Sequence, residues 1–182
     1  MLIRIPDLEV QELVFQEGFQ PGAIDLGPEL AQQGLLETSG RAELVEEHHG
    51  RQKPVQDIRV VGKYAVRIGT RCARCLEPVE HALAGSFDLL YRPTGADFRA
   101  PEVSISEAET EIGYYRGEGL LLEDVVREQI LLSLPARSMC SEGCKGLCPR
   151  CGRNLNLERC DCPEPPPDSR WAALEEIRRK LD

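Results

Sequence analysis

Apolar and polar residues alternate most regularly between positions 58 and 71. The apolar set is Ile58, Val60, Tyr64, Val66 and Ile68, and the basic set is Arg59, Lys63, Arg67 and Arg71. A period of two predicts a β-strand with one buried face. A two-residue turn at Gly62-Lys63 would place Ile58 opposite Arg67 and mix the two sets. We therefore expect one long strand that bends at a bulge at Gly62.

A second strand is predicted just downstream, because Leu83, Phe87, Leu89 and Tyr91 again alternate with small or polar residues. The segment 72–78 between the two strands contains a proline and has the length of a hairpin turn. Shorter strands are expected within residues 2–15 and 41–47, whereas residues 18–40 show no clear period. Residues 93–111 are acidic and poor in apolar side chains, which indicates a long loop.

Helical spacing appears in two places. Leu122, Val126 and Ile130 recur every fourth residue, which predicts a helix over residues 120–134 that Pro135 ends. A shorter helix is predicted after Asp168, where the apolar residues are Trp171, Leu174, Ile177 and Leu181. These elements indicate an α+β domain over residues 1–139, with an antiparallel sheet that could curve into a barrel and one packed helix. Residues 140–182 form a cysteine-rich tail with the terminal helix.

The charge of the chain is unevenly distributed. The net charge is −9, but residues 51–75 carry +6, between segments of −8 and −7 and a neutral tail. Phosphate contacts come mainly from Lys and Arg, so this acidic chain cannot coat RNA but could make one localised contact. The candidate RNA- or partner-binding residues are Arg59, Lys63, Arg67, Arg71 and Arg74. The alternative is that these side chains pair with carboxylates on neighbouring strands of the same sheet.

The longest apolar run is far shorter than the roughly 18 residues that a membrane helix needs. No apolar signal segment or lipidation motif is apparent, so we expect a cytoplasmic protein without a membrane partner. Disulfides rarely persist in a reducing cytosol. The eight closely spaced cysteines of this chain therefore indicate metal ligands rather than a disulfide framework.

The cysteines suggest one or two zinc sites. Cys148 and Cys151 form a Cys-x-x-Cys pair followed by Gly152, where the chain often turns with a positive φ. A first site would use Cys148, Cys151, Cys160 and Cys162. A possible second site would use Cys72, Cys75, Cys140 and Cys144, and would pin the predicted hairpin to the segment after the long helix. Cys144 could instead join Cys148, Cys151 and one of the last two cysteines.

The thiols have two other conceivable uses. A thioredoxin-like redox pair would open a helix in a βαβ unit, whereas Cys72 and Cys75 fall in a predicted hairpin turn. Buried thiols can also serve simply as small apolar side chains. The sequence contains no recognisable nucleophile, general base or phosphate loop. We therefore expect neither an enzyme nor a small-molecule substrate.

Four segments of the chain resemble the YceD-like family. They are CARCLEPV at 72–79, LLSLP at 131–135, CKGLCPRCGRNLN at 144–156 and CDC at 160–162. The resemblance runs from about Arg51 to Leu181 and is weak before residue 50. Its members are bacterial and plastid proteins linked to large-subunit ribosomal RNA accumulation and processing. It implies a cytosolic role in ribosome biogenesis, with a tail zinc that stabilises one branch of the family.

Three hypotheses follow from these observations. In the first, the chain is a noncatalytic assembly factor that contacts large-subunit rRNA or a ribosomal or assembly protein through the basic strand face or the zinc tail. In the second, it is a zinc-stabilised adaptor whose acidic surface, such as residues 102–128, binds a basic protein, with indirect effects on RNA. The third and weakest is a thiol redox sensor.

Overall fold

The computed structural model describes residues 1–47, 55–96, 112–163, 170 and 177–178. They fall into two compact units. The sheet unit comprises Met1–Ala73 and Glu77–Cys140, and the cysteine-rich unit comprises Arg74–Leu76 and the chain from Ser141 onward. None of the helices in the described ranges has the length and apolar character needed to cross a membrane.

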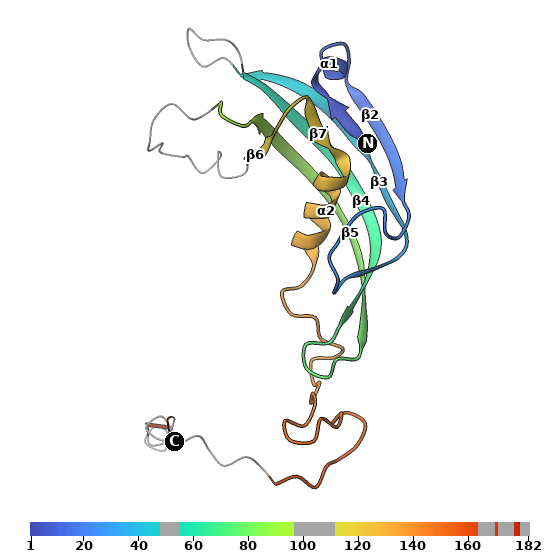
Figure 1. Ribbon diagram of the computed structural model, residues 1–182, viewed down its shortest axis with the longest axis vertical. Helices are drawn as coiled ribbons and strands as arrows, with labels where there is room; N and C mark the ends of the chain where they lie inside the picture. Colours follow the sequence, from blue (N-terminus) through green and yellow to red (C-terminus); the bar gives the residue numbers. More distant parts are fainter. Residues whose placement is uncertain (48–54, 97–111, 164–169, 171–176, 179–182) are drawn as a thin grey trace. The chain divides into compact units, whose positions relative to one another are not determined.

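The sheet unit is built on one five-stranded sheet (Figure 1). Its strands are β2 (Leu13–Phe19), β3 (Ala31–Glu47), β4 (Val55–Arg71), β5 (Pro78–Pro93) and β6 (Ile112–Tyr115), and they lie side by side in that order. Neighbouring strands are antiparallel except β5 and β6, which are parallel. The sheet is therefore mixed and mostly antiparallel.

A second sheet has two strands. It pairs β1 (Leu2–Arg4) with β7 (Gly119–Leu121), and α1 (Ile5–Leu8) follows β1 directly. Helix α2 (Leu122–Ser133) begins immediately after β7. The pairing of β1 with β7 thus fixes the start of α2 near the chain's first residues.

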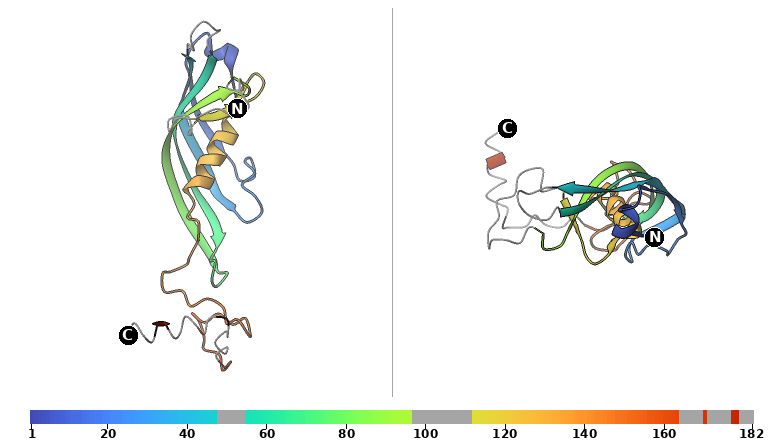
Figure 2. Two further views of the ribbon diagram at one scale, coloured as in Figure 1. Left: turned by 90° about the vertical axis from the view of Figure 1, so that its left-hand side faces the viewer. Right: turned by 90° about the horizontal axis from the view of Figure 1, so that it is seen from above.

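Helix α2 provides the apolar side chains that fill the inside of the curved sheet. Figure 2 shows the sheet bending around this helix. Leu122, Val125, Val126 and Ile130 of α2 are buried in one core with residues of β2 to β6. The hydroxyl of Tyr64 on β4 lies 3.3 Å from the main-chain oxygen of Gln129 and also contacts the Ser133 hydroxyl. One polar ring thereby ties the middle of the sheet to the helix.

Glycines face aromatic rings at four cross-strand positions of the sheet. The pairs are Phe15 with Gly40, Phe87 with Gly62, Tyr64 with Gly85, and Tyr91 with Gly113. All four rings are buried. A Cβ atom built on Gly62 would lie 2.7 Å from Cζ of Phe87, and one built on Gly113 would lie 2.5 Å from Cε1 of Tyr91. Each ring therefore occupies space that only a glycine leaves open.

The structure confirms the predicted strand over residues 58–71 and its hairpin partner. Strand β4 runs unbroken through Gly62 and pairs with β5 across the turn at residues 72–77. Its apolar set is buried, and the basic residues Lys63, Arg67 and Arg71 are exposed. The bulge predicted at Gly62 is wrong. The register shifts instead in β3, between Gln33 and Glu37, and Gly62 makes room for the Phe87 ring.

The α+β class is confirmed, but the barrel is not. The strand order ends at β2 and β6, and these two strands do not pair with each other within the described residues. The sheet stays open because α2 fills its inner face, so the apolar side chains are covered without closure. The helix predicted over residues 120–134 is confirmed as α2, with its first two residues in β7.

Several predicted elements lie wholly or partly outside the described residues. These are most of the loop over residues 93–111 and most of the terminal helix after Asp168. Strand β3 begins ten residues before the expected segment 41–47, because the polar side chains from Gln32 to Ser39 mask its period. The boundary between residues 139 and 140 remains a prediction.

Candidate metal centres and the basic strand face

The eight cysteines gather into two groups of four. We call Cys72, Cys75, Cys140 and Cys144 the first-knuckle group, because it contains the first Cys-x-x-Cys pair along the chain. It corresponds to the possible second zinc site of the sequence analysis. The tail group is Cys148, Cys151, Cys160 and Cys162, which corresponds to the first site. Within each group the four sulfur atoms lie within 4.8 Å of one another. All eight thiols are free of disulfides. These are the two sets considered in the sequence analysis, whereas the alternative grouping of Cys144 with the tail cysteines is not the arrangement found.

Both Cys-x-x-Cys segments have the same local geometry. The amide of the first cysteine donates to the carbonyl five residues ahead, from Cys72 to Glu77 and from Cys148 to Arg153, each at 2.8 Å. The residue after the second cysteine has a positive φ, 62° at Leu76 and 73° at Gly152. Leu76 is the one non-glycine residue with positive φ in the described ranges. Turns of this kind leave amides free to bond sulfur.

Several polar groups already support the sulfur atoms. The amide of Cys140 donates to Sγ of Cys72 at 3.4 Å, and Nδ2 of Asn156 donates to Sγ of Cys144 at 3.3 Å. Backbone amides of Cys151 and Arg150 bond the Cys148 sulfur and lower the pKa of that thiol to about 6. A hydrogen bond with the Cys151 thiol raises the pKa of Cys162 to about 12. Within the tail group, these contacts favour the thiolate form of Cys148 over that of Cys162.

The geometry of both groups fits a tetrahedral zinc ion. Four thiolates at about 2.3 Å from one zinc ion lie about 3.8 Å apart, which is compatible with the observed clustering. Cys72, Cys75, Cys144 and Cys148 are buried, while Cys140 and Cys151 are exposed. A set of four converging thiols without disulfides suits a metal ion that prefers sulfur ligands, rather than hard cations, which prefer oxygen ligands.

Arg74, a candidate partner-binding residue, makes structural contacts beside these cysteines. Its guanidinium donates from Nη1 to the carbonyl of Cys144 at 2.7 Å. Its own carbonyl accepts from the amide of Leu147 at 3.1 Å. Arg74 therefore holds the start of the cysteine-rich segment in place, a role that spacing alone could not reveal.

The other basic candidates lie along the face of β4 that points away from α2. Arg59 makes a bidentate pair with Asp88 on β5, at 2.8 and 2.7 Å, and lies 3.5 Å from Glu43 on β3. The hydrogen bond from Arg59 lowers the pKa of Asp88 below its usual value. Arg67 lies 3.9 Å from Glu80. Arg59 and Arg67 therefore pair with carboxylates of neighbouring strands, as the alternative interpretation of the basic residues predicts, although the Arg67 pair is long.

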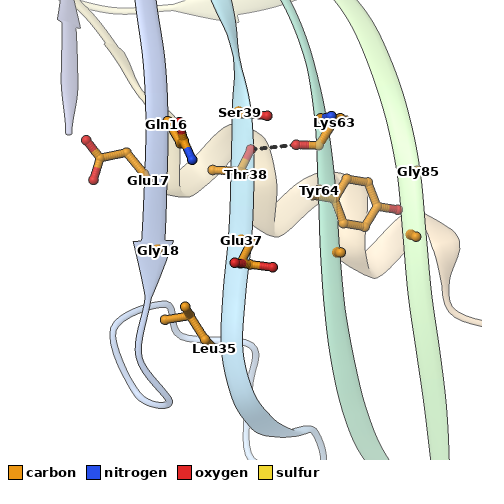
Figure 3. Close-up of a pocket in the computed structure, with 12 residues that line it drawn as sticks. Gln16, Glu17, Gly18, Leu35, Glu37, Thr38, Ser39, Lys63, Tyr64 and Gly85 are labelled. Atoms are coloured by element: carbon orange, nitrogen blue, oxygen red, sulfur yellow. Dashed lines mark hydrogen bonds between the residues drawn. The ribbon is translucent and has the colours of Figure 1, made fainter.

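Lys63 and Arg71 differ from their neighbours on this face. Both side chains are exposed, and neither has an ion-pair partner in the part of the chain that the structure describes. Lys63 lines a hollow across β2 to β5, together with Ala65 and Ala84. Figure 3 shows this hollow on the side of the sheet opposite α2. The uncompensated positive charge of β4 is thus concentrated at Lys63 and Arg71.

Comparison with known proteins decides the family. The family model described as large ribosomal RNA subunit accumulation protein YceD matches residues 60–178. The chain belongs to the YceD family. The match begins in β4 and continues through all eight cysteines. Membership implies a role in large-subunit rRNA accumulation.

Two curated proteins illustrate the similarity to known relatives. An uncharacterized protein of Mycobacterium tuberculosis is 32% identical over 162 residues, which cover 88% of this chain and 67% of the relative. An Arabidopsis thaliana protein named large ribosomal RNA subunit accumulation protein YCED homolog 1, chloroplastic, is 32% identical over 56 residues, or 31% of this chain and 17% of that protein. No solved structure gives a significant match.

Proposed function

We propose that this YceD family member is a noncatalytic, zinc-stabilised factor of ribosome biogenesis that acts in the cytoplasm and contacts large-subunit rRNA directly. The observation that carries this proposal is the family match over residues 60–178, which covers β4 from Val60 onward and both cysteine groups. The name printed for the chloroplast relative supports the same process. The absence of any recognisable catalytic motif in the sequence favours a binding role.

Zinc is proposed as the resident metal of both cysteine groups. Thiolates would supply all the ligands, and four-cysteine sites of this kind are structural because no coordination position stays open for a substrate. In the described part of the cysteine-rich unit, the buried apolar side chains are those of Cys75, Cys144 and Cys148. The described part of this unit therefore has no apolar core apart from these thiols, so metal binding would provide the free energy that orders it.

Lys63 and Arg71 are proposed as the cations of β4 that contact RNA phosphates. A cation already paired with carboxylates releases few counterions on meeting phosphate, whereas an unpaired exposed cation gains the full effect. The bidentate pair with Asp88 therefore makes Arg59 a poor contact. The acidic balance of the rest of the chain limits binding to this localised surface.

Charge reversal tests this contact. The full-length variant Lys63→Glu/Arg71→Glu should bind large-subunit rRNA fragments at least about tenfold more weakly, with a salt slope smaller by roughly two, because two phosphate contacts are lost. Filter binding across a salt titration measures both quantities. Arg4→Glu/Arg116→Glu is the matched control, since it changes the charge equally at exposed residues outside β4.

Three outcomes would contradict the proposal. Equal loss in both variants would show that only total charge matters, and unchanged binding in the β4 variant would exclude this strand as the contact. If the wild-type protein binds no rRNA, direct contact is wrong. Crosslinking to ribosomal proteins would then identify the partner.

A further inference from the structure

Asn156 lies in the loop between the two halves of the tail group, but its side chain bonds a cysteine of the first-knuckle group. Nδ2 of Asn156 donates to Sγ of Cys144 at 3.3 Å. Its Oδ1 atom accepts from the amide of Lys145, the next residue, at 2.8 Å. One side chain thus orients both the sulfur of Cys144 and the backbone that follows it.

The position of Asn156 is itself fixed by a network inside the cysteine-rich unit. Oδ1 of Asn154 accepts from the amide of Asn156 at 3.0 Å and from its Nδ2 at 2.9 Å. The amide of Leu155 donates to the carbonyl of Gly146 at 2.9 Å, and Leu147 forms a β-bridge with Asn154. Residues 154–156 are therefore held against residues 144–148.

The cysteines of the tail group lie on both sides of residues 154–156 in the sequence. The segment from Asn154 to Asn156 connects Cys151 to Cys160, and both ends of it belong to one cluster of four sulfurs. Gathering those sulfurs around one ion shortens the closed loop and restricts its conformations. Loop ordering lowers the entropic cost of placing Asn156 beside Cys144.

We propose that Asn156 is a positioning residue through which metal binding at the tail group strengthens metal binding at the first-knuckle group. The amide donor stabilises the Cys144 sulfur as a thiolate and holds it in the ligating direction, as outer-shell donors do at metal sites. Linkage makes the effect reciprocal, so filling either group favours the other. This inference rests on the zinc sites of the proposed function.

Cobalt titration of the reduced full-length protein tests the coupling. Tetrahedral thiolate sites give strong cobalt absorption bands, and zinc displacement then reports the zinc affinity. Asn156→Ala should lower the metal affinity of the first-knuckle group by about 10- to 100-fold, the range for outer-shell partners. The protein should still bind two metal ions per chain. Leu157→Ala is the matched control, because its side chain is 78% exposed in the same loop.

Asn156→Asp separates positioning of the sulfur from support of the backbone. The aspartate keeps an oxygen for the Lys145 amide but replaces the donor to sulfur with a second oxygen. We expect it to lose affinity as Asn156→Ala does. Wild-type affinity in Asn156→Asp would overturn the proposal, because backbone support alone would then account for the contact.

A double-mutant cycle tests the link between the groups. Cys160→Ser/Cys162→Ser removes two ligands of the tail group and should weaken the first-knuckle group by a factor similar to that of Asn156→Ala. Adding Asn156→Ala to this variant should then have little further effect. Fully additive losses would refute the coupling. A wild-type protein that binds no metal would instead refute the zinc sites themselves.

Discussion

At the scale of single residues, the glycines of the large sheet act through the side chains they lack. Gly40 and Gly62 face each other on β3 and β4, and each accepts a ring from its other neighbour, Phe15 on β2 and Phe87 on β5. Glycine in a strand costs backbone entropy. Here an aromatic ring packed over the bare backbone offsets that cost, as in engineered pairs of this type.

Gly40→Ala should destabilise the protein by about 1–3 kcal/mol, the usual range for overpacking. The new Cβ atom would lie 2.6 Å from Cα of Gly62 and 2.8 Å from Cζ of Phe15, and the backbone has little freedom to yield. Gly18→Ala is the control, because its Cβ would meet the flexible end of Leu35 at 3.3 Å. Urea unfolding followed by circular dichroism should show the loss at Gly40 alone; equal midpoints for the two variants would contradict it.

Leu76 and Asn156 mark what the sequence does not reveal at this scale. Gly152 announces the turn after Cys151, because glycine readily adopts positive φ, and the structure confirms it. Leu76 adopts the same conformation at a cost of roughly 1–2 kcal/mol, and no local propensity would predict that. Asn156 acts through a sulfur twelve residues away. Such contacts depend on the folded loop rather than on spacing.

At the scale of elements, a strand or helix can be predicted from the sequence when one of its faces is buried along its whole length. Strands β4 and β5 and helix α2 have regular apolar periods, and these periods predict all three elements. Strand β3 is interrupted by the register shift between Gln33 and Glu37 and carries polar side chains around it, so the sequence predicts only residues 41–47 of its 17 residues as a strand. The open sheet could not be distinguished from a barrel, since strand periodicity says nothing about how edges end.

Helix α2 offers a sharp comparison between buried and exposed positions two residues apart. Ile130 is fully buried and Leu132 is 72% exposed. Ile130→Ala should lower the free energy of unfolding by about 2–5 kcal/mol, because it leaves a cavity against the sheet. Leu132→Ala should stay within about 0.5 kcal/mol of the wild type. Thermal and urea unfolding of both variants measure the difference, and a comparable loss at Leu132 would mean that α2 is packed differently.

At the scale of the whole molecule, the two units differ in what stabilises them. The buried apolar cluster that runs from Ile3 to Ile130 lies entirely in the sheet unit. In the described part of the cysteine-rich unit, only cysteine thiols contribute to the buried apolar set. One unit is thus expected to be stable without metal, and the other to require it.

Metal removal should therefore affect the units unequally. The purified protein should contain two zinc ions per chain, one for each cysteine group. A chelator should abolish hydrogen-exchange protection around Cys148 and leave that of β4 and α2 nearly intact, because the sheet unit keeps its core. Zinc, but not magnesium, should restore it. Unchanged protection around Cys148 after complete metal removal would refute metal-dependent ordering of this unit.

The aromatic rings that pack over glycines also help to fix the register of neighbouring strands in the sheet. A slip of β5 along β4 by two residues would keep every buried side chain on the buried face, so the apolar pattern alone does not oppose it. The slip would, however, move Phe87 from Gly62 to Val60 or Tyr64, where a side chain already fills the space. Four such ring-and-gap pairs leave one alignment in which all the rings fit, and long strands like these need that safeguard against misalignment.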